Sequence, residues 1–327
     1  MTETKSFNYS EFAEPQNETM ESHLKIGLIA DNNFVSKYVF QLVEKANRQE
    51  NIAFTHLIIQ KQSQIKQGKV TRIFKLLMRF KIRLLFQRAL FLMIRVVEGF
   101  LLRRGKHFDH FQITSLEDHI PTSLAIKPLV SKSGFIYRYS NEDIEKVKSL
   151  SLDVLIMCGS GILKGEILNS CKYGIISFHH GDNRVYRGSP AGFWEVYNKN
   201  PTTGFVIQRL TEEIDGGDVY FRGHFLTQYY YYLNQAVLYD RSNYYMVKFL
   251  TDLVSIGELP PICDQEIYFN RLFRLPSPIQ LIKYLARFIY RFSAKQISRR
   301  IFNLDYRWGV AFSRGHWQDL VMWRATK

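Results

Sequence analysis

Residues 174–218 read GIISFHHGDNRVYRGSPAGFWEVYNKNPTTGFVIQRLTEEIDGGD, and this stretch decides the fold that we expect. The apolar pair Ile175-Ile176 predicts a strand that ends at two adjacent histidines, His179 and His180. Turn residues follow, then a helical stretch, a second strand and a glycine loop that begins at Asp215. Enzymes of the α/β class carry acid and base groups at such strand ends, over a cleft at the edge of the sheet.

The 327-residue chain is strongly basic, with a net charge of +14, and its 46% apolar content supports a sizeable core. The charge predicts an anionic partner: a phosphate compound, a nucleic acid or a membrane surface. Cys158, Cys171 and Cys263 are odd in number and lack metal-binding spacing, which indicates a reduced, cytoplasmic compartment. Residues 1–23 are polar and predict a disordered tail without a signal peptide.

The chain after this tail opens with a βαβ pattern. Residues 24–30 (LKIGLIA) predict a buried strand, residues 34–47 have helical spacing, and residues 52–59 predict a second strand. This order predicts an α/β fold, a Rossmann-like, mostly parallel sheet flanked by helices. No GxGxxG follows the first strand, so a dinucleotide site has little support.

Residues 61–107 interrupt the pattern as a basic, amphipathic helical insertion. Between Lys69 and Arg104, Arg72, Lys75, Arg79 and Arg83 recur at steps of three or four. A solvated basic face is the ordinary interpretation, and contact with anionic lipid or a phosphorylated substrate is the alternative. No apolar run here reaches the ~20 residues that cross a bilayer.

The α/β pattern then resumes and continues to residue 258. Ser140 or Asn141 is the expected cap of the first helix in this part. We expect helices over 141–150, 163–169 and 235–253, strands over 152–157 and 173–178, and an antiparallel pair over 204–210 and 219–225.

Residues 259–327 predict a basic C-terminal extension. Ser277-Pro278 starts a helix to about residue 298, on which Lys283, Arg287, Arg291 and Lys295 form a basic stripe. Residues 307–323 predict two strands around a Ser-Arg-Gly turn, either a docked hairpin or the start of an incomplete β domain.

Five motifs stand in a fixed order: GSGILKGEIL from Gly159, GIISFH ending at His179, Tyr186-Arg187-Gly188-Ser189-Pro190, Thr203-Gly204, and Asp215-Gly216-Gly217-Asp218. Together they resemble the catalytic domain of the 10-formyltetrahydrofolate-dependent formyltransferases. That family includes methionyl-tRNA, glycinamide ribonucleotide and sugar N-formyltransferases. The resemblance is loose over residues 24–59 and close over 150–255, and it implies a catalytic domain over residues 24–258.

The resemblance implies a catalytic set of His, Asp and Asn. His179 matches the His and Asp215 the Asp, whereas Ser177 stands where the family has Asn. Formyl transfer to an amine builds an oxyanion, which needs donors, and releases a proton, which needs an acceptor. Ser177 is a shorter donor than Asn, and His180, Asn183 or a water are the candidates to replace the amide.

The resemblance also implies residues that bind the two substrates. For 10-formyltetrahydrofolate they are Cys158, Gly159, Gly161, Ile162, Gly216, Gly217 and Asp218. For the acceptor they are His180, Asn183, Arg187 and Gly188. We expect no metal, because adjacent strand residues such as His179 and His180 point to opposite faces.

Among acceptors, an amino sugar, nucleotide-linked or part of a surface glycan, is the first expectation. The region after residue 258 does not match the tRNA-binding β-barrel of the methionyl-tRNA enzymes, although the charge of +14 keeps a tRNA acceptor open. A second hypothesis is a catalytically impaired binding protein, because of Ser177. We expect a cytoplasmic protein, either free or peripheral at the inner membrane face through Lys69–Arg104.

Overall fold

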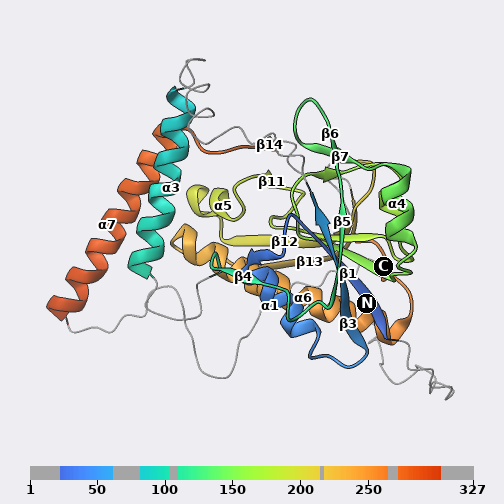
Figure 1. The fold of residues 1–327 in the computed structure, drawn as a ribbon. Helices are drawn as coiled ribbons and strands as arrows, with labels where there is room; N and C mark the ends of the chain where they lie inside the picture. The colour runs from blue at the N-terminus through green and yellow to red at the C-terminus, as the bar shows by residue number, and fades with distance from the viewer. Residues whose placement is uncertain (1–22, 62–81, 103–109, 214–216, 264–271, 303–327) are drawn as a thin grey trace, which may run out of the picture.

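A seven-stranded sheet forms the centre of the chain (Figure 1). The structure, a computed structural model, describes residues 23–61, 82–102, 110–213, 217–263 and 272–302. Across the sheet the strand order is β13 (Asp218–Leu226), β12 (Thr202–Arg209), β10 (Ile175–His179), β8 (Val154–Met157), β1 (Leu24–Ala30), β3 (Ile52–Gln60) and β5 (Thr122–Ile126). All neighbours are parallel from β10 to β5, and β12 is antiparallel to both β10 and β13. The predicted mostly parallel α/β fold is confirmed.

The apolar strands supply both faces of the sheet, because successive side chains alternate between them. On β8, Val154 and Ile156 join a core beneath α1 (Lys37–Ala46) and α6 (Tyr231–Ile256). Leu155 and Met157 join a second core, to which α4 (Asn141–Lys148) contributes. Burial on both faces explains why these strands are continuous apolar runs in the sequence.

The first helix of this second core begins as predicted. Ser140 is the N-cap of α4, and its hydroxyl accepts a hydrogen bond from the Asp143 backbone N–H at 3.2 Å. Glu142 and Asp143 lie in its first turn, where the positive end of the helix dipole favours them.

Two predicted helices begin later than the sequence pattern indicated. Residues 34–36 form β2 (Phe34–Ser36), which pairs with β4 (Ile113–Ser115), so α1 starts only at Lys37. The second is the helix expected over residues 163–169. Its first residue belongs to β9 (Ile162–Leu163), which pairs with β7 (Ile136–Arg138), and β7 also pairs with β6 (Leu129–Val130). Gly165, at φ +87°, then limits the helical part to a 3₁₀ turn over Glu166–Asn169. Both differences come from pairing with distant segments, which local periodicity does not contain.

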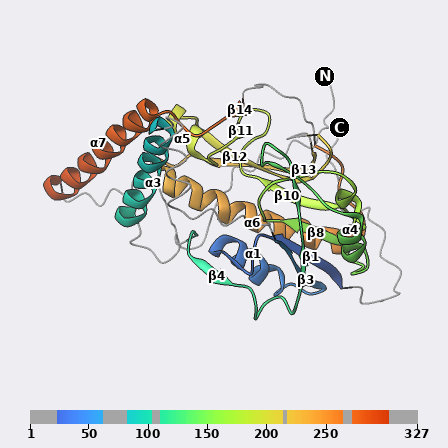
Figure 2. The ribbon, with the colours of Figure 1, turned by 45° about the horizontal axis from the view of Figure 1, so that its top comes forward.

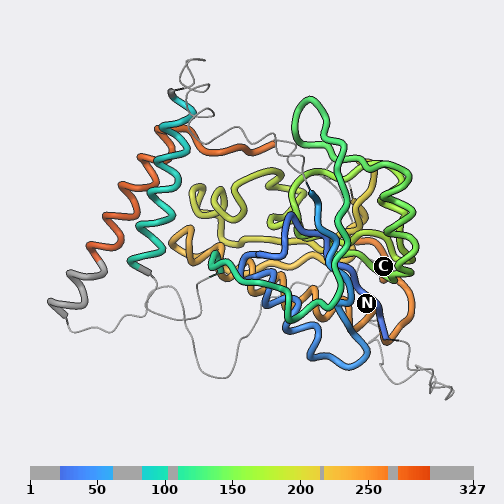
Figure 3. The backbone as a smooth tube through the Cα atoms, viewed as in Figure 1, coloured from blue at the N-terminus to red at the C-terminus, as the bar shows by residue number. Residues whose placement is uncertain are grey.

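A third core lies at one end of the molecule, where α3 (Ile82–Leu102) and α7 (Pro278–Phe302) run side by side in both views (Figures 1 and 2). Ile94 of α3 packs there with α5 (Phe193–Asn198) and with Leu281 and Phe288 of α7. The tube in Figure 3 shows how far apart in the chain these two neighbours are. The helix predicted from Pro278 is present, and residues 307–323, expected as two strands, lie outside the described residues, as do 1–22, 62–81 and 103–109.

The start of α6 is capped by side chains from α3 and α7. Its N-cap residue, Tyr230, makes no side-chain capping bond. Instead Glu98 of α3 accepts from the Tyr232 N–H at 2.7 Å, and the Tyr284 hydroxyl of α7 accepts from the Tyr231 N–H at 2.7 Å. Tyr284 in turn donates to Glu98. These bonds satisfy buried N–H groups that a helix start leaves open.

Two of the four cations in the predicted basic stripe of α7 make hydrogen bonds to backbone carbonyls of the domain. Arg287 donates to the Tyr197 carbonyl at 2.9 Å and Arg291 to the Tyr229 carbonyl at 3.0 Å. Lys283 is exposed. In the described part of the chain, no helix combines the length and hydropathy needed to cross a membrane.

Candidate functional site

A cavity of about 270 Å³ opens at the carboxyl ends of β8 and β10. Eight of the residues that the sequence assigned to the site line it: Cys158, Gly159, Gly161, Ile162, Ser177, His179, His180 and Gly217. Tyr38 from α1 and Thr211 and Glu213 from the loop after β12 complete part of the wall. In open parallel sheets, ligands bind at such strand ends.

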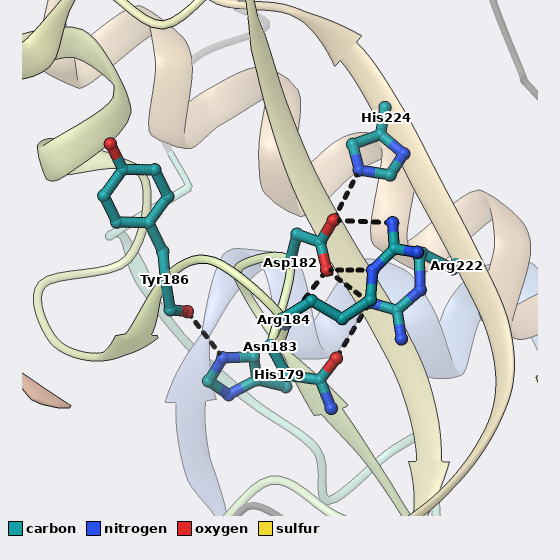
Figure 4. Close-up of polar contacts among 7 residues, drawn as sticks. All are labelled: His179, Asp182, Asn183, Arg184, Tyr186, Arg222 and His224. Carbon is teal, nitrogen blue, oxygen red and sulfur yellow. Dashed lines mark hydrogen bonds and ion pairs between the residues drawn. The ribbon is translucent and has the colours of Figure 1, made fainter. Parts of the chain in front are cut away.

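His179, the last residue of β10, has a defined ring orientation. Its Nε2 lies 3.1 Å from the carbonyl oxygen of Tyr186 (Figure 4). A carbonyl only accepts, so Nε2 carries the hydrogen and Nδ1 is the acceptor of the neutral ring. A Cβ at Gly181 would lie 2.8 Å from that carbonyl oxygen, so glycine here keeps the contact free.

Ser177 lies two residues before His179 and lines the same cavity, but its hydroxyl donates to the Phe178 carbonyl at 3.1 Å. Directly opposite it on β12 is Gln208. Gln208 also lines the cavity, is only 6% exposed, and its buried Oε1 has no hydrogen-bond partner among the described residues. Gln208 is not among the residues predicted from the sequence, because only the strand register places it across from Ser177.

His180 is held as a neutral ring inside the wall of the cavity. Burial, with a smaller contribution from the charge of His179, lowers its pKa to about 3. Its Nε2 lies 3.2 Å from the Ser242 hydroxyl, and its ring stacks on Phe178 at 5.2 Å. His180 therefore does not replace the missing amide as a charged donor. No group of three or more His, Cys, Asp or Glu side chains that could hold a metal occurs in the described ranges.

The glycine turn after β8 is fixed by polar side chains from neighbouring strand ends. Asp31 accepts from the Ser160 N–H at 2.9 Å, and Gln60 donates to the Ser160 carbonyl at 3.1 Å. A Cβ at Gly159 would lie 2.3 Å from the Gln60 amide nitrogen, so glycine leaves room for this side chain. Cys158 beside it is half-buried, and burial raises the pKa of its thiol to about 12, which keeps the thiol neutral.

The loop between β12 and β13 is closed at its base by an ion pair. Arg209 donates twice to one Asp218 oxygen, at 2.6 and 3.1 Å, so the Asp218 carboxylate binds Arg209 and does not line the cavity. Asp215 and Gly216 lie outside the described residues. Glu213 and Gly217, the described residues on either side of them, both line the cavity.

Asp182 is the centre of a buried polar network beside His179 (Figure 4). Its carboxylate accepts from Arg184 at 3.0 Å, from His224 at 2.9 Å, and from Arg222. Burial by itself would raise the pKa of this carboxyl, but the hydrogen bonds from His224 and Arg184 and the charge of Arg222 hold it well below its usual range. Asp182 is therefore a permanent anion in the folded chain.

This network also positions the loop that orients His179. The backbone carbonyl of Asp182 accepts from the N–H groups of Val185 and Tyr186, at 2.9 and 2.8 Å. Tyr186 then presents its own carbonyl to His179 Nε2. Gly204 on β12 admits the loop, because a Cβ there would lie 2.8 Å from the Asp182 Cβ.

The remaining predicted acceptor residues lie away from the cavity. Asn183 is buried and accepts from Arg222 at 2.8 Å. Arg187 and Gly188 form β11, which pairs with β14 (Leu272–Phe273). Gly188 has φ +100°, and a Cβ there would lie 2.1 Å from the Phe273 carbonyl oxygen, so this glycine is a packing requirement.

Comparison with known proteins gives the following matches. No family model matches the chain. Methionyl-tRNA formyltransferase of Bacillus velezensis is 25% identical over 193 residues, covering 57% of this chain and 57% of that protein. The Bacillus subtilis enzyme is 34% identical over 79 residues, covering 24% of this chain and 25% of that protein. The first match thus spans little more than half the length of that relative, and the second spans a quarter.

Comparison with solved structures gives two further matches. Glycinamide ribonucleotide transformylase 1 from Symbiobacterium toebii has a TM-score of 0.47 at 11% identity, covering 77% of this chain and 99% of that one. The N-formyltransferase from Helicobacter canadensis, in complex with folinic acid and dTDP-3-aminofucose, has a TM-score of 0.40 at 10% identity, covering 83% and 82%. In sequence, this chain is similar to parts of the methionyl-tRNA formyltransferases of these two Bacillus species.

Proposed function

We propose that the chain transfers a formyl group from 10-formyltetrahydrofolate to an amine. The observation that carries the proposal is the cavity, which brings His179, Ser177 and the glycine turn after β8 to one place. The methionyl-tRNA formyltransferase relatives support the same chemistry. In the proposal, 10-formyltetrahydrofolate lies along Cys158, Gly159, Gly161 and Ile162 and supplies the formyl carbon that the amine attacks.

His179 and Asp215 are the proposed proton-transfer groups. The Tyr186 carbonyl fixes Nε2 of His179 as the protonated nitrogen, which leaves Nδ1 to accept a proton or, once protonated, to donate to the oxyanion. Asp215 is the proposed acceptor for the amine proton, directly or through water. Its support is that Glu213 and Gly217, two residues away on each side, line the same cavity.

Gln208 is the proposed replacement for the family Asn. The Cβ atoms of residues that face each other on neighbouring strands lie roughly 5 Å apart. The longer Gln208 side chain can therefore place its amide in the space that an Asn at position 177 would fill. The Gln208 amide carbon lies 3.4 Å from the Cβ position of Gly217, beside the loop that carries Asp215. Rotation of the Gln208 amide by about 180° exchanges its NH₂ group with Oε1, which has no hydrogen-bond partner among the described residues. The NH₂ group would then be the donor at that position.

For the acceptor, we propose an amino sugar, nucleotide-linked or part of a glycan. Past residue 258, the described residues contain β14 and the long helix α7, packed against α3, rather than several strands of a β-barrel. This arrangement does not favour the methionyl-tRNA acceptor, although the net charge of +14 suits a nucleic acid.

The test is direct assay of the purified chain with 10-formyltetrahydrofolate and a panel of acceptors: aminated nucleotide-sugars, free amino sugars and methionyl-tRNA. Mass spectrometry of the acceptor reports the added formyl group, and calorimetry reports folate binding. We expect turnover with an aminated sugar and its loss in His179→Ala. Folate binding without turnover on any acceptor would instead identify a binding protein, and no folate binding would overturn the proposal.

The role of Gln208 has its own test in the same assay. Gln208→Leu is expected to lower kcat by about 10²–10³, the usual effect of removing an oxyanion donor. Adding Ser177→Asn to that variant restores an amide from the neighbouring strand and is expected to recover much of the loss. A Gln208→Leu variant with full kcat would refute this role, and melting curves of each variant control for folding.

A further inference from the structure

The outward faces of α3 and α7 are apolar, unlike those of an ordinary surface helix. On α3 the exposed stripe is Phe86, Met93, Val96 and Phe100, which are 54%, 42%, 61% and 80% exposed. A helix at the surface of a globular domain normally carries polar residues on the face away from the core. Here the opposite face of α3 is already buried in the third core through Ile94, so the helix is apolar on both sides.

The neighbouring helix repeats this pattern. On α7, Ile279, Ile282, Ile289 and Tyr290 are 65%, 52%, 54% and 76% exposed. Its buried face, with Leu281, Tyr284 and Phe288, belongs to the same core as Ile94. Both apolar stripes therefore point away from one shared core, and apolar surface of this extent marks an interaction site.

The exposed charges beside these stripes are all positive. Arg83 and Arg88 of α3 and Lys283 of α7 are exposed. The single acid of α3, Glu98, is 0% exposed, and α7 contains no Asp or Glu. Apolar side chains flanked by cations are the pattern of helices that lie in the interface of an anionic bilayer.

We propose that the α3–α7 surface docks on an anionic lipid bilayer, with the apolar stripes in the headgroup region and the cations against lipid phosphates. The charge of the surface favours a bilayer over a second copy of the chain as the partner. A two-fold dimer through this surface would bring the same patch, and so the same cations, against itself. A bilayer of acidic lipid offers the opposite charge and accepts the apolar side chains without a matching protein surface.

Vesicle flotation of the full chain tests the proposal, with phosphatidylcholine vesicles that contain or lack phosphatidylglycerol. We expect binding to the acidic vesicles at low salt, weakened by high salt, and little binding to phosphatidylcholine alone. Replacing Arg83, Arg88 and Lys283 by Gln is expected to weaken binding roughly a hundredfold, from the contribution of each cation near an anionic surface.

A matched pair of variants distinguishes binding through this surface from nonspecific binding through any exposed apolar residue. Phe100→Glu places a charge in the α3 stripe and should abolish binding, whereas Phe135→Glu, at a residue 68% exposed next to β7, should leave binding unchanged. Both positions are exposed, so both variants should melt like the parent. Absence of binding at low salt, equal loss in the two variants, or a dimer in light scattering that Phe100→Glu dissociates would overturn the proposal.

Discussion

Replacing Glu98 by Gln should remove a large pH dependence from the stability of the chain. Glu98 is 0% exposed, at the junction of α3, α6 and α7. Burial raises the pKa of its carboxyl from 4.5 to about 7, although the hydrogen bonds from Tyr284 and from the start of α6 act in the opposite direction. The folded chain therefore holds a proton here that the unfolded chain releases at a lower pH.

The size and the sign follow from proton linkage. A difference between a pKa of about 7 in the folded chain and 4.5 in the unfolded chain corresponds to about 3 kcal/mol at roughly 1.4 kcal/mol per unit. Below the pKa of Glu98 in the unfolded chain, the carboxyl is neutral in both states. The contribution of Glu98 to the free energy of unfolding is then fully present. As the pH rises through about 7 the carboxyl ionises in the buried site, and this stability is lost.

Urea unfolding of the parent and of Glu98→Gln, from about pH 5 to about pH 8, measures the effect. The amide cannot ionise, so the free energy of unfolding of the parent, relative to that of the variant, should fall by about 2.5 kcal/mol over this range. His180, whose pKa burial lowers to about 3, acts in the opposite direction but is common to both proteins and cancels. Glu195→Gln, at a second buried Glu whose pKa burial raises to about 7, should remove a pH dependence of the same sign. A difference between parent and Glu98→Gln that stays constant with pH would refute the reasoning.

Three further substitutions test the packing around the site, each by urea unfolding. Asp182→Asn should cost about 3–5 kcal/mol, because Arg184 and Arg222 keep their charges in a buried place; a cost under 1 kcal/mol would contradict a permanent anion there. Gly188→Ala should cost more than Gly134→Ala, since both have positive φ but only the first Cβ meets a backbone oxygen; equal costs would contradict the close approach of β14. Ser140→Ala should cost about 1 kcal/mol through the lost cap of α4, and no change would show that the cap contributes nothing.

The order of strands and helices was within reach of the sequence. Strand β1 and helix α4 appear as an apolar run and a capped amphipathic segment, and both are local signals. The cluster at the cavity was also within reach, because His179 and the glycine turn after β8 belong to motifs with a fixed spacing. The predicted helix over residues 34–47 failed at its first three residues, because their partner, β4, lies far along the chain.

By itself, the sequence determined the α/β class, the strand that delivers His179 and the positive charge of α3 and α7. Only the tertiary structure decided that Gln208 faces Ser177, that Asp182 is held by β13, and that Glu98 caps α6. The physical reason is the distance along the chain over which each kind of interaction acts. Hydrophobic periodicity and caps act over a few residues, whereas register and burial depend on which distant segments meet when the chain closes around its cores.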